Sequence, residues 1–313
     1  MAVAALLAVL RAGEPGSRRD IEIVAFTPVG LLLALVGIVA AALLVRRLPA
    51  LALVAGASAV VLAVLHAWWL APLYVGTVPR AGDGPELVVL TQNFEDGDPR
   101  ALGALARQNE VDVLVITDAP PEQAAAVGAV VGSTLPFTTL GNGAGTVVWS
   151  RFPITSDTFI SDGGESRRVT LHVPDSAPLD LVAVHPSPPY QEDGAKWIDD
   201  WHLIHDHLMR AYGGSADHPV LVVGDFNATR DHAPMRDLEE MGFRDAGEQL
   251  NQGLVATWPA NWKQRRLGLP IPTLLGLDHV LTSGGLVPTE VLVSDAAGSD
   301  HRGVIATVAA PPR

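Results

Sequence analysis

The sequence predicts an α/β domain preceded by transmembrane helices, and two observations carry this prediction. Within the first 80 residues, two long runs contain no charged side chain. After them, short β-branched runs alternate with amphipathic segments bounded by proline, glycine and aspartate. We therefore divide the 313 residues into a membrane anchor, residues 1–80, and a folded domain, residues 81–313.

The anchor is expected to contain two or three transmembrane helices. Ile23–Val45 is an uncharged run of 23 residues, and a second run extends over Leu48–Val78. Both exceed the roughly 20 residues that a helix needs to cross a bilayer. Residues 1–10 are apolar but too short to cross alone, so a third span is left open. Buried helices of a soluble core are the alternative, which the length of these runs disfavours.

This anchor predicts a multi-pass protein of the cell membrane, with the lipid bilayer as its partner. Trp68 and Trp69 fit the aromatic belt of a membrane interface. With Arg46 and Arg47 in the cytoplasm, the following domain is extracellular, which is the orientation we expect. Three basic residues favour the opposite orientation: Arg11, Arg18 and Arg19.

The domain is strongly acidic. Of the 21 basic and 34 acidic residues of the chain, six and three lie in residues 1–80, which leaves 15 and 31 and a net charge of −16. Because duplex-binding proteins draw most of their non-specific affinity from basic groups, long nucleic acid is a less favoured partner than a small ligand. Cysteine is absent, which excludes disulfides, zinc–thiolate sites and thiol catalysis.

The first half of the domain contains two predicted strands with a helix between them. The strand Leu87–Thr91 is followed by Asn93. Asp98-Pro99 is typical of a helix N-cap and first helical residue. The strand Val111–Thr117 is mostly apolar, so we expect it to be buried on both faces, and it ends in Asp118.

The second half is richer in strands. Trp197, Trp201, Ile204 and Leu208 recur at helical spacing and predict one amphipathic helix. A shorter helix is expected over Ala233–Met241. The predicted strands are Thr146–Ser150, Arg168–Val173, Leu179–Val184, Val220–Val223, a strand starting at Asp278, Glu290–Val293 and Val304–Val308.

The most informative stretch is Gly224-Asp225-Phe226-Asn227, which follows the apolar strand Val220–Val223. An acid and an amide at the mouth of a buried strand can hold a water molecule and a charged oxygen near a metal. Taken alone, these residue types are equally typical of an ordinary strand-to-turn boundary.

Polar residues follow other predicted strands as well, and ligands gather where strand ends meet loops. Carboxylates, amides and histidines without cysteine form the donor set of a hard divalent cation, Mg²⁺ or Mn²⁺. They suit phosphoryl chemistry, in which the metal neutralises phosphate oxygens and an acid or Asp–His pair accepts a proton from water. The set is Asn93, Asp118, His185, Asp225, Asn227, Asp278, Asp300 and His301.

Seven motifs follow one another along the domain: Gln92-Asn93, Asp118, Trp149-Ser150-Arg151-Phe152-Pro153, His185-Pro186, Gly224-Asp225-Phe226-Asn227-Ala228-Thr229, Asp278-His279-Val280-Leu281 and Ser299-Asp300-His301. Their order resembles the endonuclease/exonuclease/phosphatase superfamily (DNase I-like), and the apolar N-terminal segment is similar to its bacterial membrane-anchored members. From about Leu87 to the C-terminus, the resemblance implies a four-layer α/β sandwich, in which two packed mixed β-sheets are flanked by helices. It also implies metal-dependent cleavage of phosphate esters.

The resemblance further implies catalytic roles for five residues. Asp225 and Asn227 would orient the nucleophilic water and the phosphate, and His185 would face the scissile phosphate. His301 would handle a proton or bind phosphate, held in place by Asp278. Arg167 and Arg168 are candidates for an additional phosphate contact.

The implied metal ligands are Asn93, Asp118 and Asp300. The chief metal ligand of the family is a glutamate, whereas this chain carries Asp118, whose carboxylate reaches about one methylene less. The expected function is a membrane-anchored phosphoesterase acting on a phosphodiester or a phospholipid headgroup. An extracellular nuclease and a weakly active or inactive binding module are the alternatives.

Overall fold

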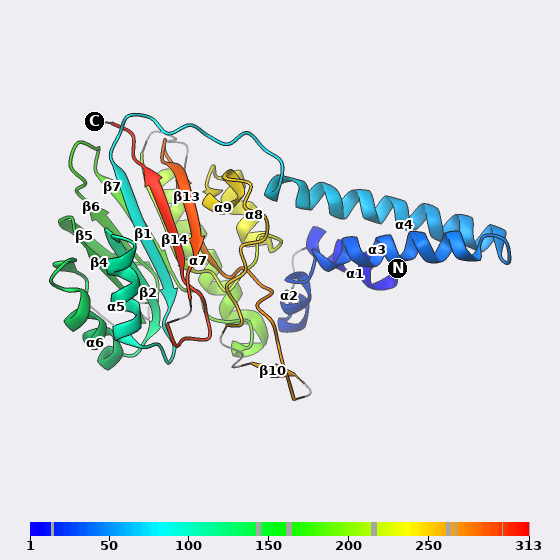
Figure 1. Ribbon diagram of the computed structural model, residues 1–313, viewed down its shortest axis with the longest axis horizontal. Coiled ribbons are helices and arrows are strands. Elements are labelled where there is room, and N and C mark those ends of the chain that lie inside the picture. The colour runs from blue at the N-terminus through cyan, green and yellow to red at the C-terminus, as the bar shows by residue number, and fades with distance from the viewer. Residues whose placement is uncertain are drawn as a thin grey trace.

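The strands of the domain form two six-stranded mixed sheets packed face to face, with helices on both outer faces (Figure 1). Over the described residues this is a four-layer α/β sandwich, which confirms the predicted fold class. The computed structural model describes residues 1–13, 16–141, 145–160, 165–213, 218–260, 264–266, 268–295 and 297–312.

The first sheet has the order β13-β14-β1-β2-β4-β3. Its central strand β1 runs parallel to β2 and antiparallel to β14. The two parallel strands therefore end at the same edge, where Asn93 and Thr117 lie side by side in register. The strands are β1 (Glu86–Asn93), β2 (Val113–Ala119), β3 (Phe137–Thr138), β4 (Gly145–Ser150), β13 (Val287–Val293) and β14 (Val304–Ala309).

The second sheet has the order β5-β6-β7-β8-β12-β9. Strands β7 and β8 are parallel, and β12 is antiparallel to β8 in a register that pairs Asp278 with Asp225. The strands are β5 (Ile154–Phe159), β6 (Arg167–Leu171), β7 (Leu179–Val184), β8 (Val220–Asp225), β9 (Arg244–Asp245) and β12 (Asp278–Ser283). A small separate hairpin joins β10 (Arg265–Arg266) to β11 (Leu269–Pro270).

Alternating aliphatic side chains fill the space between the sheets, as period-two patterning requires. The outer face of the first sheet is covered by α5 (Pro99–Gln108) and α6 (Pro121–Val131). The second sheet is covered by α7 (Ala195–Tyr212) and α8 (Ala233–Glu240), and the predicted apolar stripe of α7 is buried there. Shorter elements are α9 (Ala246–Gln249), η1 (Ala71–Leu73) and η2 (Gln191–Gly194).

The N-terminal helices α3 (Val29–Leu44) and α4 (Pro49–Leu70) form a long hairpin that projects from the domain (Figure 1). Helix α1 (Ala2–Ala12) packs along α3. Helix α4 with its terminal turn, Pro49–Leu73, has 25 residues, and its most apolar 18-residue window has a mean hydropathy of 2.2, so it is long and apolar enough to cross a membrane.

The expectation of one continuous helix over Ile23–Val45 is wrong. The run is divided between α2 (Arg18–Val24) and α3, whose axes differ by 69°. Pro28 lies at the break and is the N-cap of α3, a position where its missing N–H costs no helical hydrogen bond. Helix α2 consequently turns away from the hairpin and packs against the domain, with Ile21 in the apolar cluster beneath α7.

Candidate active site

The strand ends of both sheets meet around one cavity of about 730 Å³. Its polar wall combines the end of β1, the end of β2 and the residues that follow β7 and β8. Seven of the eight predicted site residues line it, and Asp278 lies behind His301. The polar lining residues include Asn93, Glu95, Asp118, His185, Asp225, Asn227, Asp300 and His301, together with Glu22, His232 and Gln264.

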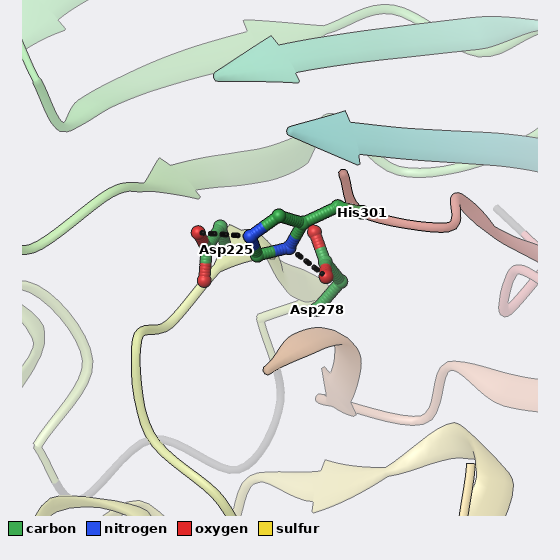
Figure 2. A group of neighbouring side chains, drawn as sticks. All are labelled: Asp225, Asp278 and His301. Atoms are coloured by element: carbon green, nitrogen blue, oxygen red, sulfur yellow. Dashed lines mark hydrogen bonds and ion pairs between the residues drawn. The ribbon is translucent and has the colours of Figure 1, made fainter. Parts of the chain in front are cut away.

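His301 lies between two buried carboxylates (Figure 2). Its Nδ1 is 2.8 Å from Asp278 Oδ2, and its Nε2 faces Asp225 Oδ2 at 3.8 Å. Burial alone would lower the pKa of His301, but the charges of Asp278 and Asp225 outweigh burial and raise it to about 9. The imidazole therefore carries a second proton at neutral pH and can donate a hydrogen bond into the cavity.

Asp225 is held by donors from both sheets. Asn93 Nδ2 donates to Asp225 Oδ2 over 2.9 Å, and the backbone N–H of Asn227 donates to Oδ1 over 2.8 Å. His185 Nε2 lies 3.9 Å from Oδ2. With its side chain 1% exposed, Asp225 depends on these neighbours for its hydrogen bonds.

The turn at the end of β8 contains two residues with positive φ, Gly224 and Asn227. Gly224 has φ +147°, and a Cβ there would lie 2.0 Å from the carbonyl oxygen of Val184 on β7, so only glycine fits. Asn227 adopts a left-handed conformation with φ 44°, which asparagine tolerates. Its Nδ2 donates to Pro186 O over 2.9 Å, and its own carbonyl accepts a hydrogen bond from Trp197 Nε1 over 2.9 Å.

His185 lies directly after β7 and bridges two acids. Its Nδ1 is 3.2 Å from Glu165 Oε2, and its backbone N–H donates to Ser166 Oγ over 3.0 Å. Burial acts to lower the pKa of His185, whereas Glu165, Asp225 and Asp118 raise it, and the net shift is upward. His185 and His301 thus lie on either side of Asp225 with imidazole nitrogens 3.9 and 3.8 Å from its Oδ2, a suitable arrangement for an anionic phosphate.

A second group of acids lies at the cavity wall beyond the histidines. Burial raises the pKa of Glu95, and the charges of Asp118 and Asp300 raise it further. Burial also raises the pKa of Asp118, with Asp225 and Glu165 adding to the shift and His185 opposing it. Such mutual repulsion is relieved when a cation binds between carboxylates.

Asp118 reaches the cavity through a local irregularity of β2. It has φ 53°, and the pairing of β2 with β4 shifts register between Ile116 and Ala119. The bulge turns the Asp118 side chain outward, whereas its strand neighbours are buried. Bulges of this kind commonly redirect a side chain at a functional site.

The residues present fit a hard divalent cation. Asp300 Oδ2 accepts hydrogen bonds from Trp258 Nε1 at 3.2 Å and Gln264 Nε2 at 3.4 Å, while Oδ1 is buried without a hydrogen-bond partner among the described residues. An uncommitted carboxylate oxygen beside Glu95 and Asp118 provides the oxygen donors that such cations prefer.

A second metal position is geometrically possible. One ligand atom each from Asp225, Asp278 and His301 lie within 4.8 Å of one another. In this group the His301 Nδ1 to Asp278 contact already commits one ligand atom of each residue. Among the described residues, Glu95, Asp118 and Asp300 do not bring three ligand atoms as close together, so a cation at that more open group would have to draw their carboxylates toward one another.

Glu95 also lines the cavity, although it was not among the residues expected from the sequence. It follows Asn93 by two residues, and its backbone N–H donates to Asn93 Oδ1 over 3.2 Å. The short distance in sequence from the Gln92-Asn93 motif could have indicated Glu95 as a site residue.

The expectation that Arg167 contacts phosphate is wrong. Its fully buried side chain lies 3.5 Å from Asp157 and over the ring of Phe159, and it does not line the cavity.

Comparisons with known proteins identify a family and a fold. The sequence model described as the Endonuclease/Exonuclease/phosphatase family matches residues 90–301. No match was found among curated protein sequences.

Several solved structures share the fold at low sequence identity. An endonuclease/exonuclease/phosphatase from Beutenbergia cavernae is 18% identical, with TM-score 0.53 over 74% of this chain and 72% of that one. TDP2 from C. elegans is 16% identical, with TM-score 0.58 over 73% and 77%. TDP2 from D. rerio, solved in complex with a single-strand DNA product, is 15% identical, with TM-score 0.55 over 71% and 98%.

Proposed function

This chain belongs to the endonuclease/exonuclease/phosphatase family, and from that premise we propose that it is a divalent-metal-dependent phosphoesterase using Mg²⁺ or Mn²⁺. Members of this family are hydrolases of phosphate esters. One observation carries the proposal: both sheets deliver their polar strand ends to the same cavity, which is lined by His185, His301 and a group of acids. We assign the cavity to one phosphate group and one attacking water.

The chain's own residues account for the proton transfers. Asp225 accepts a proton from water as the water oxygen forms a bond to phosphorus. The ester P–O bond breaks, and His301 gives its proton to the leaving oxygen, so the products are an alcohol and a phosphate with one ester bond fewer. Asn93 and Asn227 hold Asp225 for this step.

A divalent cation, when bound by Glu95, Asp118 and Asp300, would neutralise the non-bridging phosphate oxygens. His185 complements this charge from the opposite side and stabilises the negative charge that develops in the transition state. Asp278 acts behind His301, where its carboxylate orients the imidazole. We also propose Asn93 as a metal ligand, because it lines the cavity and its Oδ1 accepts one hydrogen bond in the structure and has a second lone pair.

We also propose that the α3–α4 hairpin anchors the protein in a bilayer as a multi-pass segment. Apolar side chains are exposed along both helices, which a soluble hairpin would not tolerate. Examples on α3 and α4 are Leu32, Val39, Leu43, Leu51 and Val61. The lipid bilayer is then the partner of this part of the chain.

We also propose that the domain is extracellular. The connection that carries Arg46 and Arg47 lies at the end of the hairpin remote from the domain (Figure 1). A cytoplasmic position of these two exposed arginines would place the domain on the outer side of the membrane. Arg11, Arg18 and Arg19 favour the opposite orientation.

A nuclease is the second candidate, favoured by the complex of D. rerio TDP2 with single-strand DNA. The net charge of −16 over residues 81–313 argues against tight binding of long nucleic acid. A weakly active or inactive module is the third candidate, because Asp118 stands where the family has a longer carboxylate.

The experiment uses the full chain, purified in detergent, with bis-p-nitrophenyl phosphate and a phospholipid as substrates. We expect hydrolysis with Mg²⁺ or Mn²⁺ that is lost in excess EDTA and in Asp225→Ala. Asp199→Ala, an exposed acid on α7, is the matched control and should behave as the parent. Activity that survives both EDTA and Asp225→Ala would contradict the proposed mechanism. Faster cleavage of single-stranded DNA than of either ester would favour the nuclease as the function of this protein.

A further inference from the structure

The cavity that holds the candidate active site has a second, apolar wall. Besides the histidines and acids, most lining residues are apolar or aromatic. Two of the segments that carry them are the loop that leads into β12 and α2 with the turn that follows it, which belongs to the predicted membrane anchor. A third segment contributes Pro188, Pro189 and Tyr190, and Glu22 of α2 is a charged member of the lining. The apolar lining residues of the first two segments include Ile21, Ala25 and Phe26 from the anchor and Ile271, Leu274 and Leu275 from the loop.

Helix α2 is fixed in this position by specific contacts with the domain. His232 Nε2 donates to the carbonyl oxygen of Ile21 over 2.9 Å, while His232 Nδ1 accepts the backbone N–H of Thr229 over 2.9 Å. The Ile21 side chain is fully buried beneath α7. At the end of α1, Arg11 pairs with the buried Asp231. These contacts hold α2 against the domain, so that α2 forms one wall of the cavity.

The apolar wall is continuous with the hydrophobic hairpin. Phe26 lies in the bend between α2 and α3 and is 41% exposed, and Val29 at the start of α3 is also exposed. A hydrocarbon chain passing from the bilayer toward the cavity would thus meet apolar side chains at this bend. At the other end of this path lie Asp225, His185 and His301, and the two imidazole rings can donate hydrogen bonds to a phosphate.

We propose that the cavity takes an amphiphilic phosphate ester from the bilayer, with its phosphate between His185 and His301 and its hydrocarbon chain between Phe26 and Ile271. The proposal rests on the phosphoesterase function proposed above and specifies its substrate as a membrane lipid phosphate. A water-soluble ester would leave the apolar wall unused. A polynucleotide would bring further phosphates toward Glu95, Asp118 and Asp300.

The test compares substrates that differ only in chain length. Full-length protein in lipid nanodiscs is supplied with Mn²⁺ and with methyl, butyl or octyl p-nitrophenyl phosphate. Burial of a methylene is worth about 0.8 kcal/mol, so kcat/KM should rise roughly two- to fourfold for each methylene that contacts the wall. In Phe26→Ala we expect the ratio of octyl to methyl kcat/KM to fall about tenfold.

Leu32→Ala is the matched control, because Leu32 is 63% exposed on α3 and does not line the cavity. Partitioning of the octyl ester into the nanodisc is the same for both variants. A difference between their ratios of octyl to methyl kcat/KM therefore measures contact of the octyl chain with the apolar wall. Ile271→Ala supplies a second variant from the opposite side and should lower the ratio in the same direction. An unchanged ratio in both Phe26→Ala and Ile271→Ala would overturn the proposal.

A binding measurement separates this proposal from the proposed function. Calorimetric titration with methyl and octyl phosphate requires no turnover. Octyl phosphate that binds more tightly than methyl phosphate, with the difference reduced in Phe26→Ala but not in Leu32→Ala, supports the lipid site even if no ester is hydrolysed. Equal binding of the two phosphates to the parent protein would count against it even if the methyl ester is cleaved.

Discussion

Asn93 Nδ2 donates to Asp225 Oδ2 over 2.9 Å, and this one hydrogen bond joins the last residue of β1 in one sheet to the last residue of β8 in the other. Both residues are buried, so the bond forms in a poorly solvated environment where a charge-assisted contact is strong. It fixes the position of the proposed catalytic carboxylate relative to both sheets. The arrangement of the whole site follows from this junction.

Asn93→Ala should lower kcat by roughly 10- to 100-fold, because Asp225 loses the donor that orients it. Removing a partner from a buried charged group also costs on the order of 1–3 kcal/mol of stability. Initial rates on bis-p-nitrophenyl phosphate and thermal unfolding measure the two effects. Asn109→Ala, which removes an amide bonded to the end of α5, controls for loss of an asparagine elsewhere. An Asn93→Ala enzyme with the parent's kcat would contradict the role given to this bond.

Asp278→Asn should reduce kcat by about 10²- to 10⁴-fold, the usual contribution of positioned acid–base groups. The neutral amide no longer holds the imidazolium of His301, although it occupies the same space. Steady-state kinetics at saturating substrate measure this effect, and Asp199→Asn is the exposed control. A loss confined to KM would instead point to a purely structural role for Asp278.

Glu95→Gln should weaken Mn²⁺ binding by at least about tenfold, because it removes one of the three carboxylates placed at the metal. Electron paramagnetic resonance of Mn²⁺ measures affinity without any turnover. Asp118→Glu should act in the opposite direction and bind Mn²⁺ more tightly, since it restores the longer side chain of the family. Glu122→Gln, an exposed acid at the start of α6, is the control. Unchanged affinity in both site variants would place the metal elsewhere.

The stability of the protein should fall below about pH 6.5 through His232. Burial lowers the pKa of His232, and its Nδ1 accepts the backbone N–H of Thr229, so the folded state holds the neutral ring. The nearest charges, Asp231 and Arg236, act in opposite directions. As pH falls, the unfolded chain takes up a proton that the folded chain resists, and the slope is at most about 1.4 kcal/mol per pH unit.

Thermal unfolding of the full chain at pH 8.0 and pH 5.5 tests this expectation against His232→Gln, whose amide can replace both hydrogen bonds without titrating. The variant should lose less stability between the two pH values than the parent. His205, whose pKa is also lowered by burial, contributes equally to both proteins. Identical pH dependence of parent and variant would show that His232 does not control acid stability.

The extracellular orientation can be read from a single introduced thiol, because the chain contains no cysteine. Asp199→Cys places a thiol on the exposed face of α7. A membrane-impermeant maleimide should label this variant in intact cells as fully as in permeabilised cells. Labelling that requires permeabilisation would put the domain in the cytoplasm.

Much of the fold could be predicted because its signals are local. Alternating β-branched residues, the Asp98-Pro99 helix start and the stripe from Trp197 to Leu208 each depend on neighbours within a few residues, and the structure has the expected elements. The strand ends shift by a few residues, so that Asn93 and Asp118 belong to β1 and β2 rather than following them. The bulge at Asp118 explains how a strand residue still reaches the cavity.

The sequence by itself determined the residue types of the site, the order of the elements and, through the family motifs, the four-layer architecture. The tertiary structure alone decided which distant residues touch: Asn93 with Asp225 across 132 positions, and α2 with the domain. The break at Pro28 turned an expected straight span into a wall of the cavity. Periodicity reports only which face of an element is apolar, whereas contacts between elements depend on how two sheets and a bent helix pack together in space.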